Sequence, residues 1–151
     1  MDRIDRHIVS ELQRDGRQRI ADLSQRVGLS STPCARRVAR LEREGVIRGY
    51  TAQVGQERLG LPLNAFVFVE LERHNRAAIA RFEDRLRSFD EVMECYLMTG
   101  TSDVLIRVVA ADLAGFDRFL EDGLMQIPGI RAMRSSFALR TMIRRDRLPQ
   151  I

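Results

Sequence analysis

The stretch IADLSQRVGLSSTPCARRVARLEREG, residues 20–45, decides the fold of the first part of this 151-residue chain. Apolar residues at helical spacing end at Gly28, and a second helical pattern begins within residues 30–33. The connection between the two patterns is the short, glycine-containing turn that a helix-turn-helix motif needs. A further helical pattern over residues 2–12 precedes the pair. We therefore expect three helices arranged as a helix-turn-helix unit.

The last of these helices has an apolar face and a basic face. At about 100° per residue, Cys34, Val38 and Leu41 lie within roughly 40° of one another, and arginines lie around the opposite side. Helix N-termini and hydroxyl groups contact phosphates, and Arg can read guanine in the major groove. A solvated basic face is the ordinary alternative. We expect DNA contacts from Ser30, Ser31, Thr32, Pro33, Arg36, Arg37, Arg40 and Arg43.

The charge excess lies in the N-terminal third of the chain. All 25 basic residues are Arg, and the formal net charge is +4. Residues 1–56 contain 11 Arg against 7 acids, whereas residues 57–151 contain 14 of each. Arg binds phosphate through a planar fork, although a codon bias would also remove Lys. The split favours one half that faces a polyanion and a neutral half that binds something else.

The residues after the basic helix favour β structure. The segment 46–52 is rich in β-formers and is interrupted by Gly49, which fits a small wing. Arg48 would be able to touch the DNA backbone from such a wing, although a single exposed Arg near a turn is more often uninvolved. Gly and Pro then interrupt the periodicity over residues 55–62, which we interpret as a hinge.

The second half alternates strand and helix patterns. The predicted order βαββαβ is that of the ferredoxin-like split motif. We expect strands at 65–71, 92–98 and 104–110, an extended segment at 130–143, and helices at 76–89 and 112–127. The predicted fold class is α+β, with a winged helix-turn-helix domain at 1–54, a hinge at 55–62, and a ferredoxin-like dimerisation and effector domain at 63–151.

Three of these strands are apolar almost without interruption. The runs cover residues 66–69, 96–98 and 108–110. With helices on one face only, the opposite face of an antiparallel sheet should alternate polar and apolar residues. We therefore expect a second copy of the chain to cover that face. Such a homodimer would give the DNA-binding halves the two-fold symmetry of palindromic operators.

Motifs spaced along the whole chain carry a family resemblance. They are Asp2-Arg3-Ile4-Asp5, Leu23 to Ser30, Thr32-Pro33-Cys34, Arg40-Leu41-Glu42, Gly45, Ile47, Gly49-Tyr50, Glu94-Cys95, Thr99-Gly100 and Asp103. Together they closely resemble the Lrp/AsnC (leucine-responsive, feast/famine) transcriptional regulators. The resemblance implies a winged helix-turn-helix, a ferredoxin-like effector domain that dimerises through its sheet, and assembly of dimers to a higher oligomer, usually of eight chains.

The resemblance also implies an amino-acid effector, bound between dimers near the loop that joins the second and third strands. Glycine and hydroxyl residues in this loop offer groups for a carboxylate, and Asp103 offers a partner for an ammonium group. A tight β-hairpin is the ordinary alternative. Positions on the last strand match those that line the pocket from the neighbouring dimer. The effector residues so implied are Thr99, Gly100, Thr101, Ser102, Asp103, Ser135, Ser136 and Phe137.

The effector implied is an apolar amino acid such as leucine or methionine, because the loop and strand supply little excess acid for lysine. This chain departs from the family pattern at two loop positions. Val104 stands where many members have Tyr after the loop Asp, and Thr101 stands where an acid is usual.

Other functional classes find little support. Two cysteines, Cys34 and Cys95, are too few for a disulfide framework or a zinc site, and no apolar run approaches the ~20 residues of a membrane span. His7 and His74 have no metal-binding or catalytic spacing around them and are expected on the surface. We expect a cytoplasmic protein that is not an enzyme and holds no cofactor.

Two alternatives stay open. One is a nucleoid-type architectural protein that binds DNA broadly and without an effector, with steep salt dependence. The other is a relative of haem-pathway decarboxylases that share this fold. The basic helix argues against the second, because such an enzyme has no reason to keep four arginines there.

Overall fold

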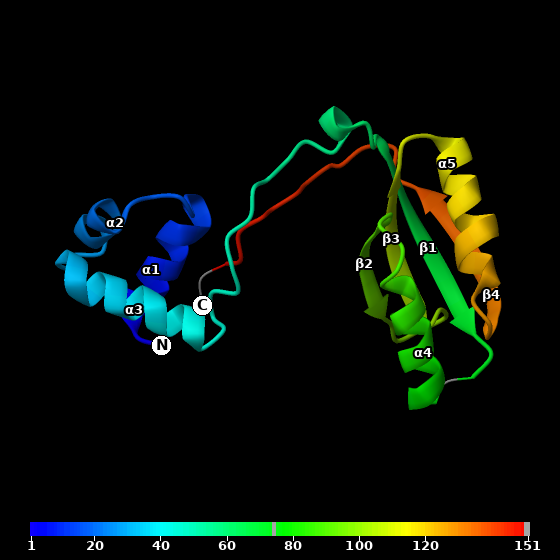
Figure 1. Ribbon diagram of the computed structural model, residues 1–151, viewed down its shortest axis with the longest axis horizontal. Helices are drawn as coiled ribbons and strands as arrows, with labels where there is room; N and C mark the ends of the chain where they lie inside the picture. Colours follow the sequence, from blue (N-terminus) through cyan, green and yellow to red (C-terminus); the bar gives the residue numbers. More distant parts are fainter. Residues whose placement is uncertain (74, 150–151) are drawn as a thin grey trace. The chain divides into compact units, whose positions relative to one another are not determined.

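The computed structural model describes residues 1–73 and 75–149 of the chain (Figure 1). It divides into two compact units. The first, here called the head, contains residues 1–53 together with the tail from Met142 onward. The second, the sheet unit, contains residues 54–141. The predicted boundaries differ from this division at two places: the tail was assigned to the domain 63–151, and residues 55–62 were set apart as a hinge that here belongs to the sheet unit.

The head is built on the three expected helices. They are α1 (Arg3–Arg14), α2 (Ile20–Arg26) and α3 (Ser31–Arg43). Each contributes apolar residues to one small core, which contains Ile8, Leu23, Val27, Cys34, Val38 and Leu41. The helical pattern around Cys34 is thus confirmed, and its thiol is buried.

The turn between α2 and α3 depends on one glycine. Gly28 has a φ of +71°, a left-handed conformation that costs glycine little. Its N–H donates to the carbonyl oxygen of Gln25 at 3.3 Å, and the N–H of Leu29 donates to that of Ser24 at 2.9 Å. This pair of bonds is a Schellman motif, which ends α2 abruptly. Ser30 then occupies the N-cap position of α3, but its side chain makes no capping hydrogen bond.

The residues of the expected wing, 46–52, favour β structure in sequence but form no strand. This segment, all of which the structure describes, contains no β-pairing. Instead a side chain fixes it, because the Tyr50 hydroxyl donates to Glu42 Oε1 at 2.9 Å. The Tyr50 ring lies against Gly16, where a Cβ would be only 3.0 Å from a ring carbon. Burial and the Glu42 carboxylate raise the pKa of Tyr50 to about 12.

The sheet unit has the predicted βαββαβ order. Its strands are β1 (Leu63–Leu71), β2 (Val92–Leu97), β3 (Val104–Ala110) and β4 (Ile130–Phe137), and its main helices are α4 (Arg76–Leu86) and α5 (Leu113–Arg118). The strand order is β2-β3-β1-β4, with every neighbouring pair antiparallel. A short 3₁₀ helix, Glu57–Leu59, lies in the expected hinge.

Three elements of the sheet unit differ from expectation, and the first is α4, which ends at Leu86 instead of at residue 89. The helical segment predicted over 112–127 becomes a π-helical turn at Phe119–Gly123 and a 3₁₀ turn at Leu124–Gln126. With the π-helical turn, which is wider than an α-helical one, both Phe119 and Leu124 lie in the core. Gly123, which has no side chain, leaves room for the ring of Phe89. The segment predicted over 130–143 forms a strand only as far as Phe137, after which a single backbone hydrogen bond, from the Ala138 N–H to the Asn64 carbonyl oxygen at 2.9 Å, continues the contact with β1.

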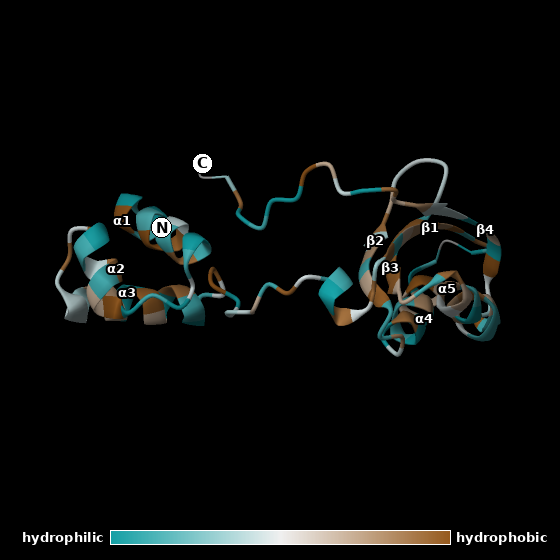
Figure 2. Cartoon of the chain, turned by 90° about the horizontal axis from the view of Figure 1, so that it is seen from above, coloured by the Kyte–Doolittle hydropathy of each residue, from teal (hydrophilic) through white to brown (hydrophobic). Residues whose placement is uncertain are grey.

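Both helices cover the same face of the sheet (Figure 2). Alternate residues of β1 and β3 point to that face and are buried, for example Val67, Val69, Ile106 and Val108. The other face, here called the open face, carries the intervening residues. No helix in the described part of the chain is long and apolar enough to cross a lipid bilayer.

Candidate functional site

A buried acid fixes the orientation of α3. Asp5, in the first turn of α1, is 1% exposed and accepts hydrogen bonds from two arginines of α3. Arg37 Nη1 lies 2.8 Å from Asp5 Oδ1 and 2.6 Å from Asp2 Oδ2. Arg40 Nη2 lies 2.6 Å from Asp5 Oδ2. The side chains of Arg37 and Arg40 therefore lie along α1 and are only 26% and 38% exposed.

The two acids of this cluster are held in the charged form. Burial raises the pKa of Asp5, but the Asp2 backbone N–H and the guanidinium groups of Arg37 and Arg40 outweigh it, so the pKa is lowered. The Asp5 backbone N–H and the Arg37 guanidinium lower the pKa of Asp2 to about 2. Asp2 and Asp5 also cap α1 reciprocally, with 2.8 and 2.9 Å hydrogen bonds.

With Arg37 and Arg40 paired to α1, other residues of α3 form the surface that faces solvent. Thr32, Arg36, Ala39 and Arg43 are exposed and follow one another at spacings of three and four, so they share one side of the helix. We call these four residues the exposed arc. Of the eight residues expected to contact DNA, Ser30, Ser31, Thr32, Arg36 and Arg43 are exposed, whereas Pro33, Arg37 and Arg40 are partly covered.

A second buried acid joins α1 to α2. Glu11 is 5% exposed and accepts from Arg14 Nη1 at 2.7 Å and from Arg26 Nη1 at 3.2 Å. His7 Nε2 lies 4.0 Å from the same carboxylate. Sequence reasoning missed both acids, although Asp5, Ile8 and Leu12 are spaced as one helix face. An acid at that position of an apolar face signals a buried ion pair.

In the sheet unit, Asp103 ties the loop between β2 and β3 to the end of β1. Asp103 Oδ2 accepts from the backbone N–H of Leu71 at 2.7 Å, and the Asp103 N–H donates to the Val69 carbonyl oxygen at 2.9 Å. One carboxylate oxygen of Asp103 is thus committed to β1. Thr99, Gly100 and Thr101 are exposed and Ser102 is half-buried, so the rest of the predicted effector loop is accessible.

The predicted effector residues of β4 lie apart from this loop within one chain. Phe137 pairs with Ala65 near the start of β1, whereas Val104 pairs with Val69 near its end. Ser135 and Phe137 point to the helix-covered face, where the Phe137 ring packs 5.1 Å from that of Phe116. Ser136, between them, belongs to the open face. Within one chain, the β2–β3 loop lies near the end of β1 and these β4 residues lie nearer its start.

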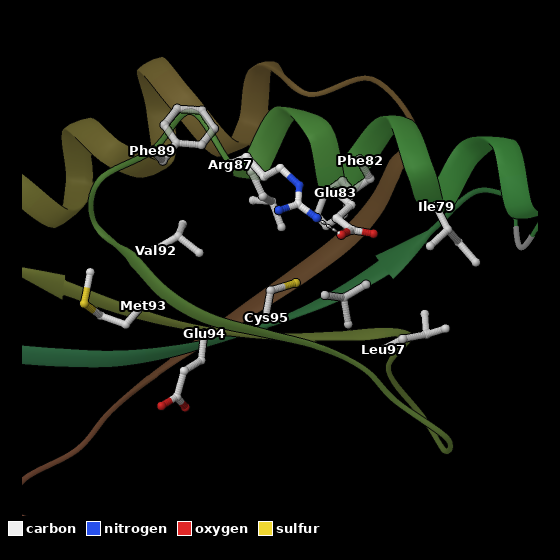
Figure 3. Close-up of a pocket in the computed structure, with 12 residues that line it drawn as sticks. Ile79, Phe82, Glu83, Arg87, Phe89, Val92, Met93, Glu94, Cys95 and Leu97 are labelled. Atoms are coloured by element: carbon white, nitrogen blue, oxygen red, sulfur yellow. Dashed lines mark hydrogen bonds and ion pairs between the residues drawn. The ribbon is translucent and has the colours of Figure 1, made fainter. Parts of the chain in front are cut away.

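A groove of about 410 Å³ lies between α4 and β2 (Figure 3). Apolar side chains such as Phe82, Leu86 and Val92 line it, and the Glu83–Arg87 ion pair lies at its rim. None of the eight predicted effector residues lines this groove, although Val104 does. Among the described residues there is no group of three or more potential metal ligands, and His74 lies outside that part of the chain.

The Asp5 cluster predicts a pH dependence of the head. Because the pKa of Asp5 is lowered on folding, its contribution to stability is present at neutral pH and is lost as pH falls below about 4. Asp5→Asn should lower the free energy of unfolding by about 1.5–3 kcal/mol at pH 7. It should also make this free energy depend less steeply on pH in the acid range. Urea denaturation followed by Tyr50 fluorescence in a Tyr96→Phe background measures this. Asp22→Asn, which breaks an exposed ion pair in the same unit, is the control and should leave the midpoint nearly unchanged. Equal effects of the two substitutions would contradict the assignment.

Comparison with known proteins gives the arrangement a family. Residues 1–48 match the model for winged helix-turn-helix DNA-binding, and residues 64–148 match that of the Lrp/AsnC ligand binding domain. The chain is 45% identical over 149 residues to the Bkd operon transcriptional regulator of Pseudomonas aeruginosa, covering 99% of this chain and 97% of that protein. It is 38% identical over 148 residues to the leucine-responsive regulatory protein of Escherichia coli K12, covering 98% and 90%.

Solved structures agree with these matches. A transcriptional regulator of Neisseria meningitidis in complex with L-methionine superposes with a TM-score of 0.92 at 35% identity, covering 99% of this chain and 96% of that one. An AsnC family regulator of Agrobacterium tumefaciens gives 0.93 at 38% identity, covering 99% and 97%. These relatives are regulators rather than enzymes. The chain belongs to the Lrp/AsnC family of DNA-binding transcriptional regulators.

Proposed function

We propose that the chain is a sequence-specific transcriptional regulator whose head binds operator DNA through the exposed arc of α3. This proposal rests on the different surroundings of the arginines of α3. Arg37 and Arg40 are paired with Asp5, whereas Arg36 and Arg43 point to solvent. The exposed hydroxyl residues Ser31 and Thr32, at the helix N-terminus, are suited to phosphates, which fixes the register of the helix. The two free guanidinium groups are suited to guanine.

We propose further that an apolar amino acid, such as leucine or methionine, is the effector. Relatives of the chain are a leucine-responsive protein and a regulator crystallised with L-methionine. The contacts would come from the loop residues Thr99, Gly100, Thr101, Ser102 and Asp103 of one chain and from Ser135, Ser136 and Phe137 of another. The ligand would change DNA binding only by binding one assembly more tightly than another.

The open face supports a homodimer as the unit of that assembly. Strand register places Phe66 and Phe68 of β1 beside Leu105 of β3 on this face, and all three are half-buried in the single chain. The arginines of this face have contacts within the chain: Arg107 Nη1 lies 3.4 Å from Glu94 Oε1, and the Arg134 guanidinium stacks 5.1 Å over the Phe68 ring. The apolar side chains at the centre of this face can be buried against the same side chains of a second copy related by a two-fold axis. Dimers would then assemble further, with an octamer as the expected size.

Substitutions on α3 test the DNA-binding face. Arg36→Ala should weaken binding to a duplex from the promoter of its own gene by about 1–3 kcal/mol, roughly 5- to 150-fold, without changing thermal stability. Arg40→Ala should instead lower the stability of the head, because it removes a partner of Asp5. Fluorescence anisotropy and thermal denaturation measure the two effects.

The reverse result, weaker binding from Arg40→Ala at unchanged stability and none from Arg36→Ala, would contradict this face. A random-sequence duplex at the same salt concentration is the specificity control. Equal affinity of the unmodified protein for both duplexes would favour an architectural protein that binds DNA without sequence preference.

A thermal-shift screen against the twenty amino acids tests the effector. A ligand at about 100 times its Kd stabilises the state it binds by about 2.7 kcal/mol, so an apolar L-amino acid should raise the Tm. Thr101→Val combined with Ser102→Ala should reduce this shift, whereas the control Thr141→Val should not. A screen in which no amino acid raises the Tm, or only a charged one does, would contradict the proposal.

Sedimentation velocity tests the dimer. Leu105→Glu places a carboxylate in the centre of the open face, and two-fold symmetry introduces it twice at each interface, so the dimer Kd should rise at least tenfold. Leu113→Glu, on the exposed side of α5, is the matched control and should leave the Kd unchanged. An unaffected dimer in Leu105→Glu would show that another surface holds the chains together.

A further inference from the structure

The tail of the chain is strongly basic. Its described residues, 142–149, include Arg144, Arg145 and Arg147 against a single acid, Asp146. All of these side chains are exposed, and the segment has no helix or strand. Arg144 Nε lies 3.2 Å from Asp146, whereas neither Arg145 nor Arg147 has an ion-pair partner among the described residues.

This tail belongs to the head rather than to the sheet from which it emerges. The division of the chain groups the residues from Met142 onward with residues 1–53. A hydrogen bond ties them together, since the backbone N–H of Leu148 donates to Gln13 Oε1 on α1 at 2.7 Å. Strand pairing explains the route: β4 ends beside the start of β1, where the Ala138 N–H donates to the Asn64 carbonyl oxygen at 2.9 Å. The tail therefore leaves the sheet where the linker to the head begins.

Including the tail changes the charge of both units. The head then contains 14 Arg against 8 acids, a net charge of +6, and the sheet unit contains 11 Arg against 13 acids, a net charge of −2. Three of the 14 arginines of the head, Arg144, Arg145 and Arg147, come from the tail. A set of exposed guanidinium groups in the same unit as a helix-turn-helix is suited to the DNA backbone, whose phosphates are bound by charge and not by sequence.

We propose that the tail is a second DNA-contacting element of the head, with Arg144, Arg145 and Arg147 binding backbone phosphates beside the site that α3 occupies. The proposal rests on DNA binding by the head, and it adds affinity and salt dependence without adding sequence discrimination. The helix-turn-helix positions the head on the DNA sequence, and the tail adds contacts to neighbouring backbone phosphates.

The salt dependence of DNA affinity tests this element. Each phosphate contact contributes about 0.9 to the slope of log Kobs against log salt concentration. Replacing all three arginines by Gln keeps the backbone bond of Leu148 and should lower the slope by about 2 to 3 per bound head. The ratio of affinities for operator and random duplexes should stay unchanged. Replacing Arg76, Arg81 and Arg85, three exposed arginines of α4, by Gln is the matched control and should leave the slope as it is.

The outcomes separate this proposal from DNA binding itself. An unchanged slope in the folded tail variant, with unmodified protein still binding the duplex, would overturn the role of the tail alone. A changed sedimentation coefficient with an unchanged slope would also overturn it, because the arginines would then serve contacts between chains. Absence of duplex binding by the unmodified protein would instead refute the DNA-binding function.

Discussion

The carboxylate of Asp5 lies out of contact with water and is neutralised by two guanidinium groups that come from the neighbouring helix. Removing such a charge from water is costly unless its hydrogen bonds are satisfied, and here Asp2, Arg37 and Arg40 satisfy them. Because Arg37 and Arg40 must reach α1, the rotation of α3 about its own axis is fixed. That rotation decides which side chains of α3 face solvent, and so the proposed DNA-binding surface depends on a contact that lies outside it.

A comparable constraint governs the sheet unit. Two helices cover one face of a four-stranded antiparallel sheet, and the aromatic residues of β1 on the other face are left half-buried. The same topology puts the end of β4 beside the start of β1. The linker before β1 and the tail after β4 therefore meet the sheet at the same end of its strands. The architecture thus leaves the proposed dimer surface uncovered, and the basic residues that follow the sheet are grouped with the head.

The sequence predicts the elements of this fold well, because helical and strand periodicities report which side chains face a core. Positions such as Cys34, Val38 and Leu41 follow directly from that pattern. Long-range partnerships do not, since helix angles alone cannot say that Arg40 reaches Asp5, which is 35 residues away. Local β propensity in residues 46–52 was misleading for a similar reason. A strand needs a partner, and there the Tyr50 side chain fixes the chain instead.

Arginine-specific modification with phenylglyoxal, read by mass spectrometry with and without operator DNA, tests the central claim about α3 most directly. Arg36 and Arg43 should react in the free protein and be protected by DNA, whereas Arg37 and Arg40, held by Asp5, should react slowly in both states. Rapid modification of Arg40 in the free protein, together with its protection by DNA while Arg36 stays reactive, would contradict the account.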